Sequence, residues 1–147
     1  MKKSSLYTIG YSGHSPETFL KRLKDAGVEV LIDVREKPLS RKKGFSKTSL
    51  NVFLNDNGIE YLHIRELGVP GELRDELKKG WCLHEYFSAF RYHLNGCTGI
   101  LEQVYAMAQR SACCLMCVEH VVEECHRSVV AETLFAQNGR KLKVEHL

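Results

Sequence analysis

The chain alternates short runs of strand-forming residues with segments of helical periodicity, and this alternation restricts the folds open to it. Val28–Val34 is a nearly continuous apolar run, typical of a strand that helices cover on both faces. Such alternation predicts parallel strands joined by right-handed helical crossovers. We therefore predict an α/β fold: a single three-layer domain with a mostly parallel five-stranded sheet and helices on both faces.

Apolar spacing and cap residues predict where the elements lie. Ser15 caps the first helix, Pro16 is its first residue, and Gly27 ends it. Another helix is expected after Ser46 or Thr48, up to Gly58. The remaining helices are expected at His84–Leu94, Ile100–Arg110 and Ser128–Ala136, and the strands at Leu6–Ile9, Val28–Val34, Ile59–Ile64, Ala112–Val118 and Lys141–His146.

Residues 65–83 interrupt this pattern. They contain Gly68, Pro70, Gly71 and Gly80, which predict an irregular segment or a short helix hidden within it. With Trp81, which we expect to be exposed, the segment has the character of a lid or a partner surface.

Length and cysteine usage limit the class of protein. The 147 residues fit one domain, residues 1–147. No apolar run approaches the roughly 20 residues of a membrane span, and the basic start lacks the apolar core of a signal peptide. The six cysteines do not follow the spacing of a secreted disulfide framework. We therefore expect a cytoplasmic protein with reduced thiols and no membrane association; its oligomeric state stays open.

Polar side chains follow each expected strand. They are Gly10–His14 after the first strand, Asp33 and Arg35 at the end of the second, His63 and Arg65 after the third, Cys117 and Glu119 after the fourth, and His146 after the fifth. Because parallel strands end at one edge of a sheet, and ligands bind there, we expect these five segments to converge on one site.

The segment from Cys117 to Arg127 carries the densest reactive chemistry. Cys125 is expected at a helix start beside His126 and Arg127, and all three influences lower the pKa of a thiol. A nucleophilic cysteine with a histidine base is one interpretation, and a cysteine that merely caps the helix is the other.

Two carboxylates are candidate general bases. Glu119 and Asp33 lie at the ends of expected strands, although for Asp33 the orientation of the loop backbone or of Arg35 is the slightly favoured role. The candidate catalytic residues are Glu119, Cys117, Cys125 and Asp33.

The turn Gly10–His14 leads into a helix and has the features of an anion cradle. Helix N-termini offer free amides and a partial positive charge, and the guanidinium groups of Arg35 and Arg127 suit phosphate. Simple capping and ion pairing within the protein are the alternatives. The expected ligand-binding residues are Gly10, Ser12, Gly13, His14, Arg35, Ser40, Arg41, His63, His126 and Arg127.

Cofactor signatures are absent from the sequence. Neither the nucleoside triphosphate loop nor the three-glycine dinucleotide fingerprint occurs, so we predict no triphosphate hydrolysis and no nicotinamide cofactor. Cys117 and Cys125 are separated by seven intervening residues, which is not a standard zinc spacing, and adjacent Cys125 and His126 rarely share one ion. The expectation is therefore no metal and no cofactor.

A basic loop supports a different class of function. Residues 35–47 contain six basic residues and one acid, together with Phe45. A cationic loop with an aromatic side chain can grip a nucleic-acid backbone. The net charge of +3 is too small to indicate nucleic acid by itself.

Eight short motifs resemble the domain-of-unknown-function family 488. They are Thr8–Ser12 with Phe19, Asp33–Arg35, Pro38–Arg41, Gly44–Ser46, Tyr61–His63, Leu67–Gly68, Leu115–Glu119 and Cys125–Arg127. The resemblance runs from Leu6 to the end, with Arg65 standing where we expect an uncharged residue. It implies an α/β domain with these motifs clustered, and it implies no activity.

The sequence thus predicts a pocket at the carboxyl ends of the strands. Its ligand would be a phosphorylated, nucleotide-like molecule or a nucleic-acid end, bound and, if the protein is an enzyme, hydrolysed or transferred. The alternatives are a non-catalytic nucleic-acid-binding module that uses the basic loop, and a thiol-dependent enzyme.

Overall fold

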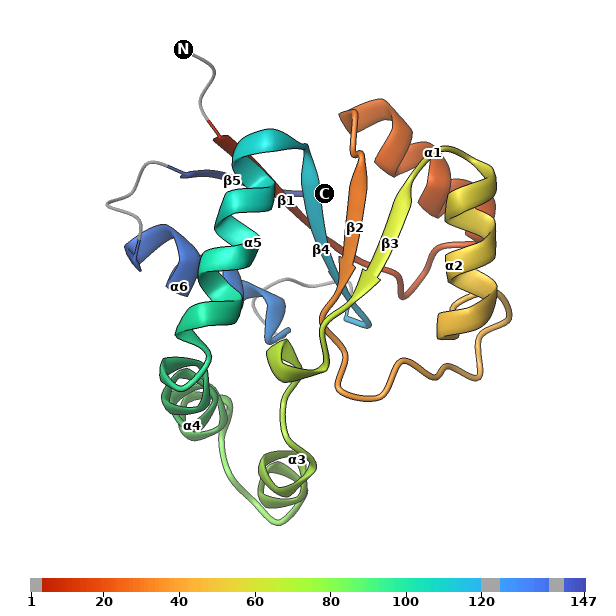
Figure 1. Cartoon of the computed structure of the whole chain (residues 1–147). Coiled ribbons are helices and arrows are strands. Elements are labelled where there is room, and N and C mark those ends of the chain that lie inside the picture. The colour runs from red at the N-terminus through yellow and green to blue at the C-terminus, as the bar shows by residue number, and fades with distance from the viewer. Residues whose placement is uncertain (1–3, 120–124, 138–141) are drawn as a thin grey trace.

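Five parallel strands form one sheet in the computed structural model, which describes residues 4–119, 125–137 and 142–147 (Figure 1). The order across the sheet is β3-β2-β4-β1-β5, and every neighbouring pair is parallel. The strands are β1 (Ser4–Gly10), β2 (Val30–Asp33), β3 (Glu60–His63), β4 (Cys113–Cys117) and β5 (Leu142–His146). The predicted α/β class and parallel sheet are confirmed.

Helices cover both faces of the sheet. Figure 1 shows α1 and α2 on one side, and α5 and α6 on the other with α4 beyond them. The helices are α1 (Pro16–Ala26), α2 (Lys47–Asp56), α3 (Gly71–Lys78), α4 (Leu83–Asn95), α5 (Thr98–Arg110) and α6 (Arg127–Gln137). Among the described residues, no helix combines the length and apolar character needed to cross a membrane.

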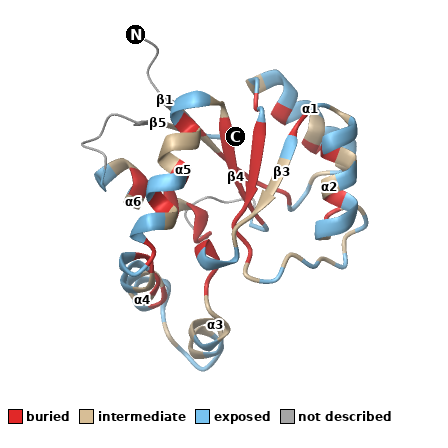
Figure 2. Ribbon diagram, in the orientation of Figure 1, coloured by how far each residue is buried: buried red, intermediate tan, exposed pale blue. Residues whose placement is uncertain are grey.

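The central strand β4 explains the continuous apolar runs. Cys114 and Met116 pack in the core beneath α1 and α2, whereas Cys113, Leu115 and Cys117 pack in the core on the opposite face. All five side chains are buried, as the red colour of this strand in Figure 2 shows. Successive side chains of a strand point to opposite faces, so a strand covered on both sides needs apolar residues at every position.

Residues 65–83 are more ordered than their composition predicts. A 3-10 turn (η1, Arg65–Leu67) and helix α3 lie within the segment. Gly71 and Pro70 conceal the helix start, because both residue types are typical of loops. Trp81, expected to be exposed, is half-buried against the larger core.

The topology creates a crevice at the carboxyl end of β4. The strands on either side of it, β1 and β2, lead into α1 and α2 on one face. Among the described residues, α6 is the helix that follows β4, and it packs in the core of the other face. Adjacent strands whose connections leave in opposite directions open a gap between the loops, and ligands bind at such switch points.

Candidate functional site

A thiol, a carboxylate and an imidazole meet at the end of β4. The Sγ atom of Cys117 lies 3.4 Å from Nδ1 of His126 and 3.6 Å from Oε2 of Glu119. His126 precedes α6, and Cys117 is the last residue of β4. Both Cys117 and His126 are buried, and Glu119 is exposed.

The hydrogen bonding of His126 fixes its tautomer. Its Nε2 lies 2.7 Å from the carbonyl oxygen of Val34, which follows β2. A carbonyl oxygen only accepts, so Nε2 carries a proton and donates it. In the neutral imidazole, Nδ1 then has a lone pair directed at the Cys117 thiol.

Cys125 lies close to this pair, two residues before α6 begins. Its side chain is 0% exposed, and its Sγ, that of Cys117 and a ring nitrogen of His126 all lie within 4.8 Å of one another. A hydrogen bond with Cys117 and burial raise the pKa of the Cys125 thiol, while His126 acts in the opposite direction. The direction is contrary to the lowered pKa expected of a thiol at a helix start.

A pocket of about 450 Å³ opens beside the cluster. Cys117, Glu119 and His126 line it together with residues that follow β2, residues of α3 and the segment just before it, and a residue of α4. These further lining residues include Arg35, Glu36, Lys37, Val69, Arg74 and Tyr86. Burial, and after it the charge of Glu119, raises the pKa of Tyr86 to about 12, so this phenol is neutral at physiological pH.

Arg35 is held by a buried carboxylate. Its Nη2 lies 2.7 Å from Oδ2 of Asp33 and its Nε 2.9 Å from Oδ1, and the two side chains are only 4% and 0% exposed. Tyr61 donates to the same carboxylate, and Nη1 of Arg35 lies 3.4 Å from the hydroxyl of Tyr11. Burial alone would lower the pKa of Arg35, but Asp33 raises it above its ordinary value. Asp33 therefore orients Arg35 and the backbone after β2, since it accepts from the Arg35 side chain and from its amide.

Arg127 joins α6 to the end of β4. It is 2% exposed, and its Nη1 donates to the backbone carbonyl of Glu119. Gly10 packs against this junction, because a Cβ placed there would lie 1.7 Å from the Glu119 carbonyl oxygen and 3.0 Å from Nη1 of Arg127.

The turns after β1 and β4 lie side by side, as predicted. The amide of Tyr11 donates to the carbonyl of Cys117, and that of Ser12 donates to the carbonyl of Val118. Gly13 and His14 complete the first turn, where Gly13 adopts a left-handed φ of 86°. None of these turn residues lines the pocket among the described residues.

The helix start at α1 satisfies its own groups. The Ser15 hydroxyl accepts from the amide of Thr18, and the Thr18 hydroxyl accepts from the amide of Ser15, which is a capping box. Nδ1 of His14 lies 3.1 Å from the same Thr18 hydroxyl. Simple capping therefore describes this turn, in line with the alternative that the sequence left open.

Ser40 and Arg41 belong to the basic loop and lie away from the pocket lining. The Ser40 hydroxyl accepts from the amide of Lys42, which closes a turn within the loop. Phe45 is 0% exposed and stacks on Tyr11, with ring centroids 4.6 Å apart. Its ring anchors the loop to the core and is not presented for stacking on a base.

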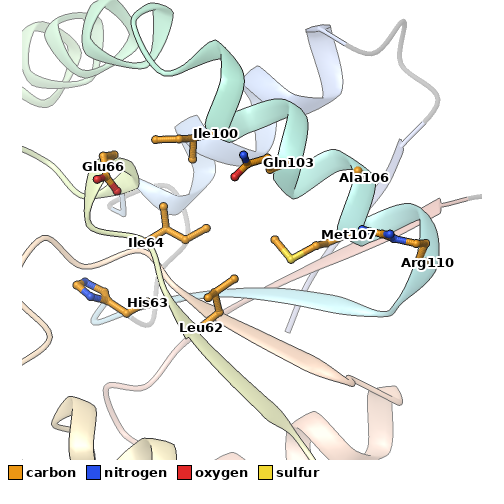
Figure 3. Close-up of a pocket in the computed structure, with 9 residues that line it drawn as sticks. All are labelled: Leu62, His63, Ile64, Glu66, Ile100, Gln103, Ala106, Met107 and Arg110. Atoms are coloured by element: carbon orange, nitrogen blue, oxygen red, sulfur yellow. The ribbon is translucent and has the colours of Figure 1, made fainter.

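His63 lies at a second hollow, of about 500 Å³, between β3 and α5 (Figure 3). Figure 3 shows Leu62 and Ile64 pointing toward α5, and Met107 pointing back toward β3. Nε2 of His63 donates to the carbonyl of Arg35, 2.7 Å away. His63 is therefore connected to the first pocket through the backbone that follows β2.

His146 does not join the other segments. It pairs in register with Thr8, two residues before the end of β1, and its Nδ1 lies 2.6 Å from the Thr8 hydroxyl. With Ser128 and Glu132 it lines a separate cavity of about 270 Å³. The predicted convergence of all five segments is wrong for this one, because β5 ends short of the site edge.

Three pocket residues escaped the sequence reasoning. Arg74 lies on α3, within the segment 65–83 that composition predicts to be irregular, and Tyr86 lies on α4, just after that segment. Lys37 was interpreted only as part of the basic loop. The motif Tyr61-x-His63 is recognisable in the sequence, but the hydrogen bond from the Tyr61 hydroxyl to Asp33 is not.

Comparison with known proteins identifies the family. Residues 15–134 match the family described as Domain of unknown function DUF488, and the chain belongs to it. No curated protein and no solved structure shows significant similarity to the chain.

Proposed function

We propose that this member of the DUF488 family binds a small ligand with a phosphate group in the pocket at the end of β4. The observation that carries the proposal is the pocket wall, which combines the cations Lys37 and Arg74 with the thiol–imidazole pair Cys117 and His126. A volume of about 450 Å³ lies in the range of small-molecule sites.

Charge compensation indicates where a phosphate would sit. The guanidinium of Arg35 is occupied by Asp33, and the Glu119 carboxylate repels an anion. Lys37 is exposed, and among the described residues no carboxylate oxygen lies within 4 Å of its ammonium. Arg74 is 38% exposed and bridges Glu36 at 2.7 Å, an arrangement that leaves it able to donate to a second anion. The phosphate is therefore assigned to the side of Lys37 and Arg74.

Binding experiments with adenosine monophosphate and inorganic phosphate test this assignment. Replacing Lys37 and Arg74 with Gln removes two charged donors, so affinity for both probes falls by about 1–3 kcal/mol per lost contact in calorimetric titrations. The matched control replaces Arg41, Lys42 and Lys43 with Gln, because these cations do not line the pocket. Equal affinity of wild type and the Lys37/Arg74 variant refutes the proposal.

The control variant also tests the nucleic-acid-binding module. If that module is the function, oligonucleotide binding shows steep salt dependence, which is lost in the Arg41/Lys42/Lys43 variant. The buried ring of Phe45 argues against this alternative.

A thiol-dependent enzyme is the second candidate function, and the 3.4 Å separation of Cys117 Sγ and His126 Nδ1 favours it. A histidine that accepts the thiol proton generates the thiolate nucleophile, in a reducing compartment such as the cytoplasm. Iodoacetamide should then alkylate Cys117 faster than the exposed Cys82 near neutral pH, as peptide mass spectrometry reports. Faster reaction at Cys82 rejects this candidate.

A further inference from the structure

We propose that Cys117, Cys125 and His126 form a binding site for a thiophilic divalent transition metal, and that the ion whose ligand preference matches the site is Zn²⁺. The thiol sulfurs and a ring nitrogen of His126 lie within 4.8 Å of one another, and all three residues are buried. This inference does not rest on phosphate binding, since it concerns the wall of the pocket and not its contents.

The spacing of the ligand atoms agrees with tetrahedral coordination. Zinc holds sulfur at about 2.3 Å and imidazole nitrogen at about 2.0–2.1 Å, which separates tetrahedral S and N ligands by roughly 3.5 Å. Cys117 Sγ and His126 Nδ1 are 3.4 Å apart. Only a small movement of Cys125 would be needed to close the set around one ion.

The second nitrogen of His126 is arranged as in metal-bound histidines. Its Nε2 donates to the carbonyl of Val34 at 2.7 Å, which leaves Nδ1 with its lone pair toward the thiols. Metal-ligating histidines usually donate their other N–H to a carbonyl or a carboxylate, which orients the ring and raises its basicity. The buried thiols Cys113 and Cys114 have no such arrangement, because they point to opposite faces of β4.

Glu119 lies beside this three-residue set, and its carboxylate would have to move toward Cys125 and His126 to supply a fourth ligand. Its Oε2 lies 3.6 Å from Cys117 Sγ, and both residues line the pocket. A set of two thiols and one imidazole selects zinc over the hard cations Mg²⁺ and Ca²⁺, which prefer oxygen ligands. Because the metal binds thiolates, its uptake releases the protons of Cys117 and Cys125.

Cobalt titration of the full chain, reduced and stripped of metal by chelation, tests the site. Co²⁺ reports thiolate ligands through a charge-transfer absorption and tetrahedral geometry through intense visible bands. We expect saturation at one Co²⁺ per chain, displacement of Co²⁺ by Zn²⁺, and release of two protons per ion. Wild-type protein that shows no thiolate-to-cobalt band on saturation overturns the proposal, and this outcome requires no variant to fold.

Variants identify the ligands. Cys117→Ala and Cys125→Ala should each weaken Zn²⁺ binding by at least about 100-fold and reduce the charge-transfer band, while Glu119→Gln should keep the band and weaken binding less. Cys82→Ala is the matched control, because Cys82 is an exposed thiol outside the cluster. Unchanged affinity in both pocket-cysteine variants also overturns the site. Phosphate and adenosine monophosphate are titrated into metal-free protein, so failure of one proposal is separable from failure of the other.

Discussion

Backbone carbonyls after β2 position the imidazoles of the site. The Val34 carbonyl accepts from His126, and the Arg35 carbonyl accepts from His63. The buried Asp33 carboxylate holds this strand end, because its Oδ1 accepts from both the backbone amide and Nε of Arg35. The ion pair therefore acts on the site by fixing the carbonyls, since its own charged atoms are already occupied.

Gly10→Ala should distort the site and destabilise the protein. The added Cβ would lie 1.7 Å from the Glu119 carbonyl oxygen, so the backbone must shift at a cost of about 1–3 kcal/mol in the free energy of unfolding. Urea denaturation measures this cost. Gly99→Ala in α5 is the control, because no atom lies within 4 Å of its added Cβ, and it should stabilise by up to about 1 kcal/mol. Equal stabilities of Gly10→Ala and wild type contradict the close approach.

The sequence indicates which residues carry reactive groups, but it does not indicate whether the charged side chains face a ligand or a partner within the protein. Arg35 and Arg127 stand where anion-binding residues often stand, and the structure buries both guanidinium groups against partners within the protein. Tyr11, which follows β1, contacts Arg35, and Tyr61 of β3 donates to the Asp33 carboxylate that holds Arg35. Such contacts depend on strand order, which residue spacing does not specify. Phosphate contacts by Arg35 and Arg127 stay a prediction.

At the scale of elements, continuous apolar runs predicted the strands correctly, whereas the glycine and proline content of residues 65–83 concealed helix α3. The run at 28–34 contains β2 because helices cover both faces of that strand. Helix α3 was obscured because Gly68, Pro70 and Gly71 precede or begin it, and its eight residues include none that is buried. A helix that buries little leaves little periodicity in the sequence.

Because α3 has no buried residue, we expect it to be locally less stable than the other helices. Its amides should exchange with deuterium faster than those of α5, which buries Leu101, Val104 and Ala108. Segments with few buried apolar contacts open locally at a lower free energy than the global transition. Hydrogen-exchange mass spectrometry resolves the two helices in one sample, and equal protection of α3 and α5 would be inconsistent with this view.

For the whole molecule, buried thiols and phenols should make stability depend on alkaline pH. Burial raises the pKa of Cys113 from 9.0 to about 11 and that of Tyr86 from 10.0 to about 12, and the pKa of Cys125 is raised as well. The folded protein therefore binds these protons more tightly than the unfolded chain. Their contribution is complete below pH 9 and is lost between about pH 9 and 12, with a slope of about 1.4 kcal/mol per pH unit for each group.

Urea denaturation under reducing conditions at pH 8 and pH 11 measures this loss. We expect a lower free energy of unfolding at pH 11. An equal value at the two pH values would show that these groups titrate alike in the folded and unfolded chain.

The parallel α/β architecture could be predicted from the rules for helical crossovers. The composition of the pocket could not, because it depends on the register of the strands. In that register, Gly10 pairs with Cys117, and Asp33 pairs with Met116 and His63, so these strand ends are level. Seven residues separate Cys117 from Cys125, and this linear spacing predicts no shared metal ion. The fold returns the chain to the end of β4, and the two thiols meet there.

Amide chemical-shift mapping of the ¹⁵N-labelled full chain with adenosine monophosphate most directly tests the central claim, that the pocket at the end of β4 is the ligand site. The largest shifts should occur after β2, at Val34–Lys37, and after β4, at Cys117–Glu119. Shifts confined to residues 40–47, or to the hollow between β3 and α5, would contradict the claim.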